Sequence, residues 1–377
     1  MSSIPFVDLS SQHQPLQAEF DQCLSTLIAQ GAFILGPDVA QFETAFAAAS
    51  GSAHGVGVAS GTDAIALGLR ACGIGPGDEV LVPANTFIAT LIGILRTGAT
   101  PVLVDCDPDT ALIDLDAAAA AITPRTAAIV PVHLYGQMVD PDALCTLATA
   151  HHLLLFEDAA QAHLAQRGGR TAGSLGTAAA YSFYPSKNLG CFGDGGMVIT
   201  ADGAIARTVR TYRNYGAAEK YLHSEWGTNS RLDNLQAAIL NRKLPHLKDW
   251  NAARHQAAQR YDAGLAPLAS HGIRPLVNVS GAGHIYHLYV IRVDTTARVN
   301  RDQLRDRLTA QGIQTGIHYP IPCHLQPAYH HLGYQPGDFP NAEHLAQSIL
   351  SLPMYPGLTP HQTETVINAI QQAATES

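Results

Sequence analysis

The chain has 377 residues, 46% of them hydrophobic and 14% charged, which is enough to bury a large core and more than one compact domain usually holds. Its 22 basic and 31 acidic residues give a formal net charge of -9, which argues against nonspecific binding to nucleic acid or to an anionic membrane surface. An anionic ligand therefore needs a local positive site.

The six cysteines stand singly, without C-x-x-C spacing, and fit a reducing compartment. The N-terminal residues lack the charged and apolar regions of a secretion signal, and no stretch approaches the roughly 18 uninterrupted apolar residues of a membrane span. We expect a soluble protein of the cytoplasm.

Short apolar runs rich in β-branched residues alternate with Ala-rich helical stretches from about residue 55 to residue 200. Near-continuous hydrophobicity is typical of buried, parallel strands that have helices on both faces. The expected strands are His54–Val58, Glu79–Pro83, Pro101–Asp105, Ala127–His133, Leu153–Asp158, Ala179–Tyr184 and Gly196–Thr200. The pattern predicts an α/β fold with a mostly parallel seven-stranded sheet flanked by helices.

Helical spacing of apolar residues from Asn229 to about Tyr261, interrupted by Pro245, predicts a helix that links two domains. Beyond it we expect a strand at Ile285–Val293 and helices at Asp302–Gln311 and Pro360–Ala373. These elements make a smaller C-terminal α+β unit. The predicted division is a large domain over residues 1–248 and a small domain over residues 249–377.

Three segments carry residues suited to one chemistry. Ser60, Gly61 and Thr62 join a predicted strand to a predicted helix, where free amides and the helix dipole favour a phosphate. Asp158 ends an apolar run, where it can pair with a pyridinium nitrogen. Lys187 follows a strand at the edge of a Gly-rich loop, where desolvation lowers the pKa of an amine that forms an imine.

Each segment alone has an ordinary interpretation: a capped helix, a turn carboxylate and a surface lysine. Ser182, shortly before the lysine, adds a hydroxyl that can bind a phosphate. Together the segments supply a phosphate cradle, a partner for a ring nitrogen and an imine-forming amine, which indicates pyridoxal 5'-phosphate as cofactor.

Longer motifs resemble the DegT/DnrJ/EryC1/StrS family of sugar aminotransferases over nearly the whole chain. The motifs are ASGTDAI, GDEVLVPANTFIAT, VHLYGQ, EDAAQAH, FYPSKNLGCFGDGG, RNYG, NSRLDNLQAAIL, HYPIPCHLQPAY and SLPMYP. The resemblance implies a fold like that of aspartate aminotransferase, that is, fold type I. One departure is Leu164, which stands where the family usually has glycine. Relatives that dehydrate sugars replace the lysine with histidine, so Lys187 favours amino transfer.

The resemblance also implies roles for the cofactor site. Lys187 carries the cofactor, Asp158 pairs with its ring nitrogen and Gln161 lies near its hydroxyl group. The phosphate is held by Gly61, Thr62 and Ser182. The ring stacks on Phe87, and Asn229 reaches the cofactor phosphate of the other subunit of a homodimer.

Substrate residues are carried over from the family's sugar-nucleotide site. They are Tyr184, Lys220, Tyr221, His318, Tyr319 and His324. His318 and Tyr319 can equally be packing residues before Pro320. No metal is expected.

The implied reaction moves an amino group from L-glutamate to C3 of a dTDP-linked 3-keto-6-deoxyhexose, through the pyridoxamine form of the cofactor. The products are a dTDP-3-amino-3,6-dideoxyhexose and 2-oxoglutarate. A 4-keto dTDP or UDP sugar and a 3-keto UDP uronate remain open as substrates. The glycan or metabolite that receives the amino sugar is not indicated.

Other classes of protein fit less well. The chain has 18 histidines, but the spacing His284-x-x-His287 falls near a predicted strand, where residues three apart face opposite ways, so a metal-dependent hydrolase is disfavoured. Gly55 and Gly57 lack the third glycine of a dinucleotide-binding turn. A binding or regulatory protein without catalysis has no need of Asp158 and Lys187 together.

Overall fold

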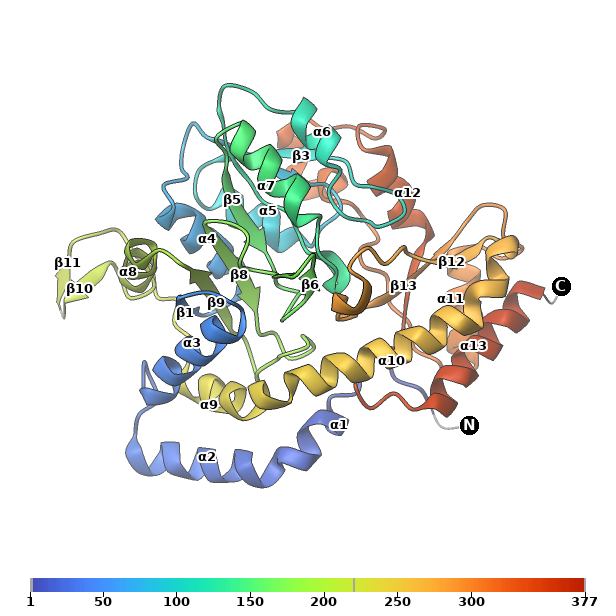
Figure 1. The fold of residues 1–377 in the computed structure, drawn as a ribbon, viewed down its shortest axis with the longest axis horizontal. Helices are drawn as coiled ribbons and strands as arrows, with labels where there is room; N and C mark the ends of the chain where they lie inside the picture. The colour runs from blue at the N-terminus through green and yellow to red at the C-terminus, as the bar shows by residue number, and fades with distance from the viewer. Residues whose placement is uncertain (1–2, 220, 376–377) are drawn as a thin grey trace.

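The computed structural model describes residues 3–219 and 221–375, and its centre is a seven-stranded sheet with the order β1-β9-β8-β5-β4-β2-β3 (Figure 1). The strands are β1 (His54–Val58), β2 (Glu79–Pro83), β3 (Thr100–Val104), β4 (Thr126–Ile129), β5 (Leu154–Asp158), β8 (Ala178–Ser182) and β9 (Gly196–Thr200). Only β9 of this sheet is antiparallel to its neighbours, β1 and β8. The predicted, mostly parallel sheet is confirmed, with small shifts at strand ends.

Helices flank this sheet because its apolar strands need cover on both faces. One helix, α4, packs against β8 and β9, while α3 packs against β1 and α9. The helices of this part are α1 (Ser10–His13), α2 (Gln17–Gln30), α3 (Pro37–Ala49), α4 (Gly61–Ala71), α5 (Ile88–Leu95), α6 (Leu115–Ala120), α7 (Pro141–Ala150), α8 (Gly203–Tyr212) and α9 (Asn234–Lys243). Fully buried valines and leucines of the strands each contribute about 1.5–3 kcal/mol to folding.

The C-terminal part has its own core around a three-stranded antiparallel sheet. The sheet is formed by β12 (Ile273–Pro275), β13 (Tyr289–Val293) and β14 (Ile349–Leu352), in that order. Its helices are α10 (Leu247–Leu265), α11 (Arg301–Ala310), α12 (Pro340–Ser348) and α13 (Pro360–Thr375). The long helix α10 runs beneath the large sheet to reach α13 (Figure 1). The predicted α+β character of this part is confirmed.

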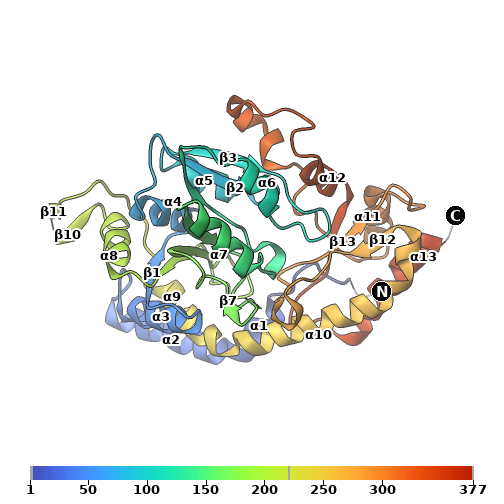
Figure 2. The same cartoon turned by 45° about the horizontal axis from the view of Figure 1, so that its top comes forward.

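Two small hairpins complete the fold. The pair β6 (Gln166–Arg167) and β7 (Arg170–Thr171) follows Asp158 in the chain, and the pair β10 (Ala217–Glu219) and β11 (Leu222–His223) projects from the body of the molecule beside α8 (Figures 1 and 2). None of the described helices is long and apolar enough to cross a membrane.

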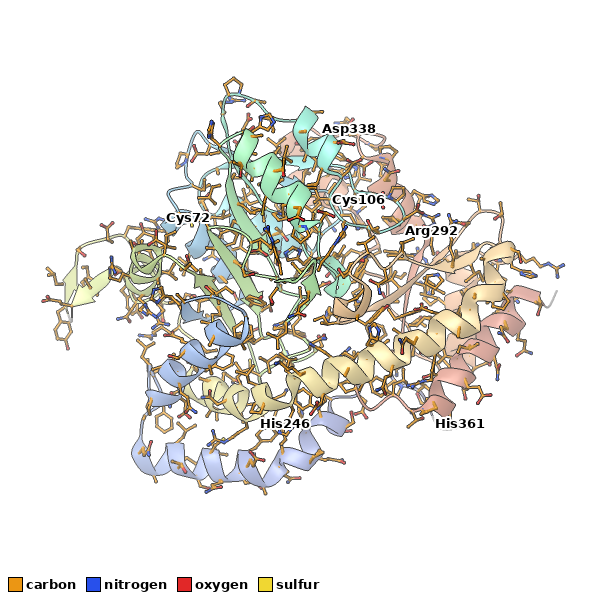
Figure 3. All side chains as sticks on the ribbon, viewed as in Figure 1. Cys72, Cys106, His246, Arg292, Asp338 and His361 are labelled. Carbon is orange, nitrogen blue, oxygen red and sulfur yellow. The ribbon has the colours of Figure 1, made fainter. Side chains whose placement is uncertain are left out.

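The two parts are joined by side chains as well as by α10. Arg292 of β13, which is labelled in Figure 3, donates to the carbonyl of Pro108 at 2.8 Å and pairs with Asp109. At the other end of the chain, Ile4 pairs with the strand-like residue Ile313 and lies in the C-terminal core. The first described residues therefore pack with the C-terminal part, and the division at residues 248 and 249 stays a prediction.

Two expected elements differ from the structure. The helix predicted from Asn229 begins only at Asn234, and a 3-10 turn at Leu244–His246 separates α9 from α10, because Pro245 cannot donate a helical hydrogen bond. The strand predicted from Ile285 begins only at Tyr289. Tyr286 has a φ of 45° and stacks on His284, so this stretch turns before the strand starts.

Candidate active site

A cavity of about 360 Å³ opens at the carboxyl ends of the parallel strands. This is the edge of a doubly wound sheet where ligands bind. The structure brings most of the candidate residues together here. Those that line the cavity are Gly61, Thr62, Phe87, Asp158, Gln161, Ser182, Tyr184, Lys187, His318 and Tyr319.

The predicted phosphate cradle lies where β1 passes into α4. Ser60 caps the helix by accepting a hydrogen bond from the amide of Asp63 at 3.1 Å, which leaves the first amides of the helix for an anion. A Cβ on Gly61 would lie 2.7 Å from the Cβ of Ser182, so only glycine lets these segments approach. Helix amides and the Ser182 hydroxyl therefore line the same end of the cavity.

Asp158 ends β5 with a buried carboxylate that has two hydrogen-bond donors. The hydroxyl of Thr90 donates to Oδ2 at 2.8 Å, and the amide of Ala160 donates to Oδ1 at 3.1 Å. Burial raises the pKa of Asp158, while the Thr90 hydroxyl and the Lys187 charge oppose that rise. A buried carboxylate of this kind is suited to bind a protonated ring nitrogen.

Gln161 has a fixed orientation beside the cavity. Its Oε1 accepts from the amide of Tyr135 at 2.7 Å, so its Nε2 must be the group that donates to the Tyr319 hydroxyl at 3.1 Å. The rings of Phe87 and Tyr319 lie 5.3 Å apart at 35°. The cavity thus has an aromatic wall and a polar wall with assigned donors.

Lys187 lies in the turn after β8 and is half-buried. Desolvation lowers the pKa of Lys187 to about 8, and the charge of Asp158 limits that fall. An amine with such a pKa is partly unprotonated near neutrality, as an imine-forming or proton-transferring lysine requires.

Neutral histidines surround this lysine. Burial lowers the pKa of His163 to about 3 and of His318 to about 4, and it lowers the pKa of His287 well below the ordinary value. The Lys187 charge adds to each shift. These rings therefore present lone pairs and N–H groups without adding positive charge.

Three of the described candidate residues are not brought into this cavity. Asn229 and Tyr221 are exposed, and Tyr221 has 84% of its surface accessible. His324 is buried, with Nε2 3.0 Å from the Glu343 carboxylate, and packs against Phe339. Lys220 lies outside the described residues. The substrate roles predicted for Lys220, Tyr221 and His324 stay predictions.

Among the cavity residues that were missed from the sequence, two have polar side chains that bear on the chemistry of the site. Thr90 supports Asp158 through its hydroxyl, and His287 lines the cavity. Thr90 follows Thr86 by one helical turn in the segment NTFIAT, a spacing that places both hydroxyls on one face of α5 and its entry. His287 had been considered only for metal binding, and no group of three metal-ligating side chains occurs in the described part of the chain.

Known proteins are similar to this chain over nearly its whole length. Residues 14–371 match the DegT/DnrJ/EryC1/StrS aminotransferase family. The dTDP-3-amino-3,4,6-trideoxy-alpha-D-glucose transaminase of Streptomyces venezuelae is 46% identical over 371 residues, which cover 98% of this chain and 96% of that protein. The UDP-N-acetyl-3-dehydro-alpha-D-glucosamine 3-aminotransferase of Acidithiobacillus ferrooxidans is 44% identical and covers 98% of both chains. The crystal structure of Streptomyces venezuelae DesV in complex with a ketimine intermediate superimposes with a TM-score of 0.96, at 46% identity and with 100% of both chains covered.

A mostly parallel sheet with a desolvated lysine, a buried carboxylate and a helix start at one edge defines a pyridoxal-phosphate enzyme of fold type I. The chain belongs to the DegT/DnrJ/EryC1/StrS aminotransferase family. It is an aminotransferase, and its cofactor is pyridoxal 5'-phosphate. The residues of the cavity fit this cofactor, because the amides at the start of α4 suit its phosphate and the Thr90-supported Asp158 suits its ring nitrogen.

Proposed function

We propose that the enzyme transfers an amino group from L-glutamate to C3 of a dTDP-linked 3-keto-6-deoxyhexose, giving a dTDP-3-amino-3,6-dideoxyhexose and 2-oxoglutarate. The observation that carries this proposal is the single cavity that holds Lys187, Asp158 and the cradle. The regiochemistry is supported by the names of the Streptomyces and Acidithiobacillus relatives, both of which refer to position 3 of a sugar. Because the name of one relative refers to a dTDP sugar and the name of the other to a UDP sugar, the nucleotide of the substrate is the first feature to test.

The cavity residues divide the work of this reaction. When bound, the cofactor supplies a reactive aldehyde carbon and an electron-withdrawing ring. Lys187 binds that carbon and, when released, moves a proton between substrate and cofactor as a general base. Asp158 keeps the ring nitrogen protonated, and Gln161 directs an N–H toward the ring hydroxyl. Phe87 covers one face of the ring and keeps water away.

The phosphate is held by Gly61, Thr62 and Ser182 at the start of α4. Tyr184, with 55% of its surface exposed, lies at the cavity rim where a large nucleotide sugar can be met. Tyr319 and His318, which also line the cavity, offer a hydroxyl and an imidazole. We assign these three residues to the sugar.

The active unit is proposed to be a homodimer. Asn229 is exposed, whereas its neighbour Ser230 is buried, donates to Asp63 at 2.6 Å and accepts from the Ala59 amide at 3.1 Å. Asn229 is thus presented outward from the base of one cradle, as expected if it reaches the phosphate in the partner subunit. Exposed apolar side chains on α2 and in the loop after it support an interface there. They are Leu24, Ile28, Phe33, Ile34 and Leu35.

Product analysis tests the substrate. Purified enzyme is incubated with L-glutamate and, in turn, with 3-keto and 4-keto dTDP sugars, 4-keto UDP sugars and a 3-keto UDP uronate, and the products are identified by mass spectrometry and NMR. We expect amination at C3 of the dTDP sugar. Amination only at C4 would contradict the assignment of the position, and amination only of UDP sugars would contradict the base.

Absorption spectroscopy tests the cofactor site. The wild-type enzyme should show the visible band of lysine-bound cofactor, and Lys187→Ala should lack it. Lys248→Ala is the matched control, since Lys248 is exposed and does not line the cavity. A band that survives in Lys187→Ala would refute the role of this lysine.

A further inference from the structure

His287 is a buried residue that lines the cavity together with Lys187, and its side chain is bound to the residue that follows the lysine. Its Nδ1 lies 3.2 Å from Oδ1 of Asn188. The protonation of this imidazole can be deduced from the amides around it.

Two backbone carbonyls fix the orientation of these amides. Asn251 of α10 donates from Nδ2 to the carbonyl of His163 at 3.0 Å, so its Oδ1 is an acceptor. Asn188 donates from Nδ2 to that oxygen at 2.8 Å and to the carbonyl of Ile285 at 3.1 Å. A carbonyl only accepts, so neither amide can be flipped.

The remaining oxygen of Asn188 must therefore accept from His287. It follows that Nδ1 of His287 carries the proton. The depressed pKa of His287 leaves the ring neutral, so Nε2 carries a lone pair. Within the described residues no group hydrogen-bonds this nitrogen.

Lys187 has the opposite need. A protonated amine carries three N–H donors, and in the described part of the chain its Nζ has no hydrogen-bond partner. The flexible four-carbon stem lets the amine reach different parts of the cavity. The Lys187 amine, a donor without a hydrogen-bond acceptor, and Nε2 of His287, an acceptor without a donor, thus belong to residues that line the same cavity.

We propose that Nε2 of His287 accepts a hydrogen bond from the Lys187 ammonium whenever the lysine is not bonded to the cofactor. Asn188 holds the ring in the tautomer that makes this possible. The inference rests on the proposed role of Lys187 and adds a positioning residue to it. By stabilising the ammonium, His287 assists the step in which Lys187 takes a proton from the substrate carbon.

Nitrogen NMR of the full-length apoenzyme tests the tautomer and the contact without catalysis. With ¹⁵N-labelled histidine, the His287 signals are assigned by their loss in His287→Gln. We expect Nδ1 to be protonated and Nε2 to be unprotonated at pH 7, and the Nε2 resonance to move on Lys187→Met but not on Ser186→Ala, a neighbouring change that keeps the ammonium. A proton on Nε2, or an Nε2 resonance that ignores Lys187→Met, would overturn the proposal.

A pair of substitutions separates the acceptor from the packing role. His287→Asn can still donate to Asn188 but has no acceptor at the position of Nε2, whereas His287→Gln can place its Oε1 there. The half-reaction with L-glutamate is followed by the absorbance of the cofactor. For His287→Asn we expect a rate about tenfold slower than wild type, with KM changed by less than about twofold. For His287→Gln we expect a rate within about threefold of wild type. A raised KM with unchanged rate, or equal losses in both variants, would refute it.

Failure of the proposed function gives a different result. If Lys187 did not carry the cofactor, the visible band would be absent from the wild-type enzyme or would survive in Lys187→Ala, while the NMR measurement would still report the tautomer of His287. A visible band that depends on Lys187, together with an Nε2–H tautomer, would overturn only the inference about His287.

Discussion

Replacing Thr90 with valine removes one of the two donors to the buried Asp158 carboxylate while keeping the shape of the side chain. The Thr90 hydroxyl donates to Asp158 at 2.8 Å and lies 2.8 Å from the Thr86 hydroxyl. A hydrogen bond to a charged group contributes about 1.5–3 kcal/mol. We expect Thr90→Val to lower the free energy of unfolding of the apoenzyme by that amount at pH 8.

The loss depends on pH. Burial already raises the pKa of Asp158, so between its unfolded and folded pKa values the folded chain binds more protons than the unfolded chain, and stability falls as pH rises through this window. Without the Thr90 donor the pKa of Asp158 rises further, and the loss should therefore be smaller at pH 5 than at pH 8.

Urea unfolding of the apoenzyme at fixed protein concentration measures this difference. Thr86→Val is the control, because it removes a bond between neutral groups worth about 0.5–1.5 kcal/mol, and its effect should not change with pH. Equal, pH-independent losses in the two variants would show that Thr90 does not support a charged Asp158.

Three further substitutions test other parts of the structure. Gly196→Ala should weaken cofactor binding by about tenfold or more, because the new Cβ would lie 2.3 Å from the Ser60 carbonyl. The control is Gly75→Ala, whose Cβ would have its nearest neighbour at 3.9 Å and which should bind the cofactor as tightly as the wild type. A spectroscopic titration with the cofactor measures both affinities. Leu164→Gly should change the free energy of unfolding by less than about 1 kcal/mol, because relief of the left-handed φ of 65° offsets the lost packing. In the same urea assay, Leu240→Ala should lower the free energy of unfolding by about 2–5 kcal/mol, because Leu240 is fully buried. Glu157→Gln should lose about 3–5 kcal/mol, because this buried carboxylate accepts from three backbone amides; a loss below 1 kcal/mol would contradict that accounting.

The sheet was predictable because each strand is a continuous apolar run that ends in a turn cluster. The same logic failed at Ile285, where apolar residues continue but the chain turns at Tyr286, since burial in a loop and burial in a strand leave the same pattern. Pro245 indicated a break in the helix predicted from Asn229. The spacing of apolar residues alone, however, did not show that this helix begins only at Asn234.

The meeting of Asp158 and Lys187 in one cavity was predictable, because both follow strands whose carboxyl ends open at the same edge of the sheet. The site was not predictable where function depends on orientation. The tautomer and orientation of His287 depend on the side-chain amide of Asn188, which Asn251 orients in turn, and both residues are distant from His287 in the chain. Leu164, where the family usually has glycine, has a left-handed φ of 65°, a backbone conformation that glycine adopts without strain and that the sequence alone did not show.

The position of β9 constrains how the chain is made. β1 pairs along its whole length with β9, and Gly196 of β9 lies against Ser60 at the start of α4. During synthesis the cradle residues leave the ribosome long before β8 and β9, so the anion site has only one wall until the second half of the chain emerges. Cofactor capture is therefore a late event, and a nascent chain arrested before Ser182 should not retain pyridoxal phosphate.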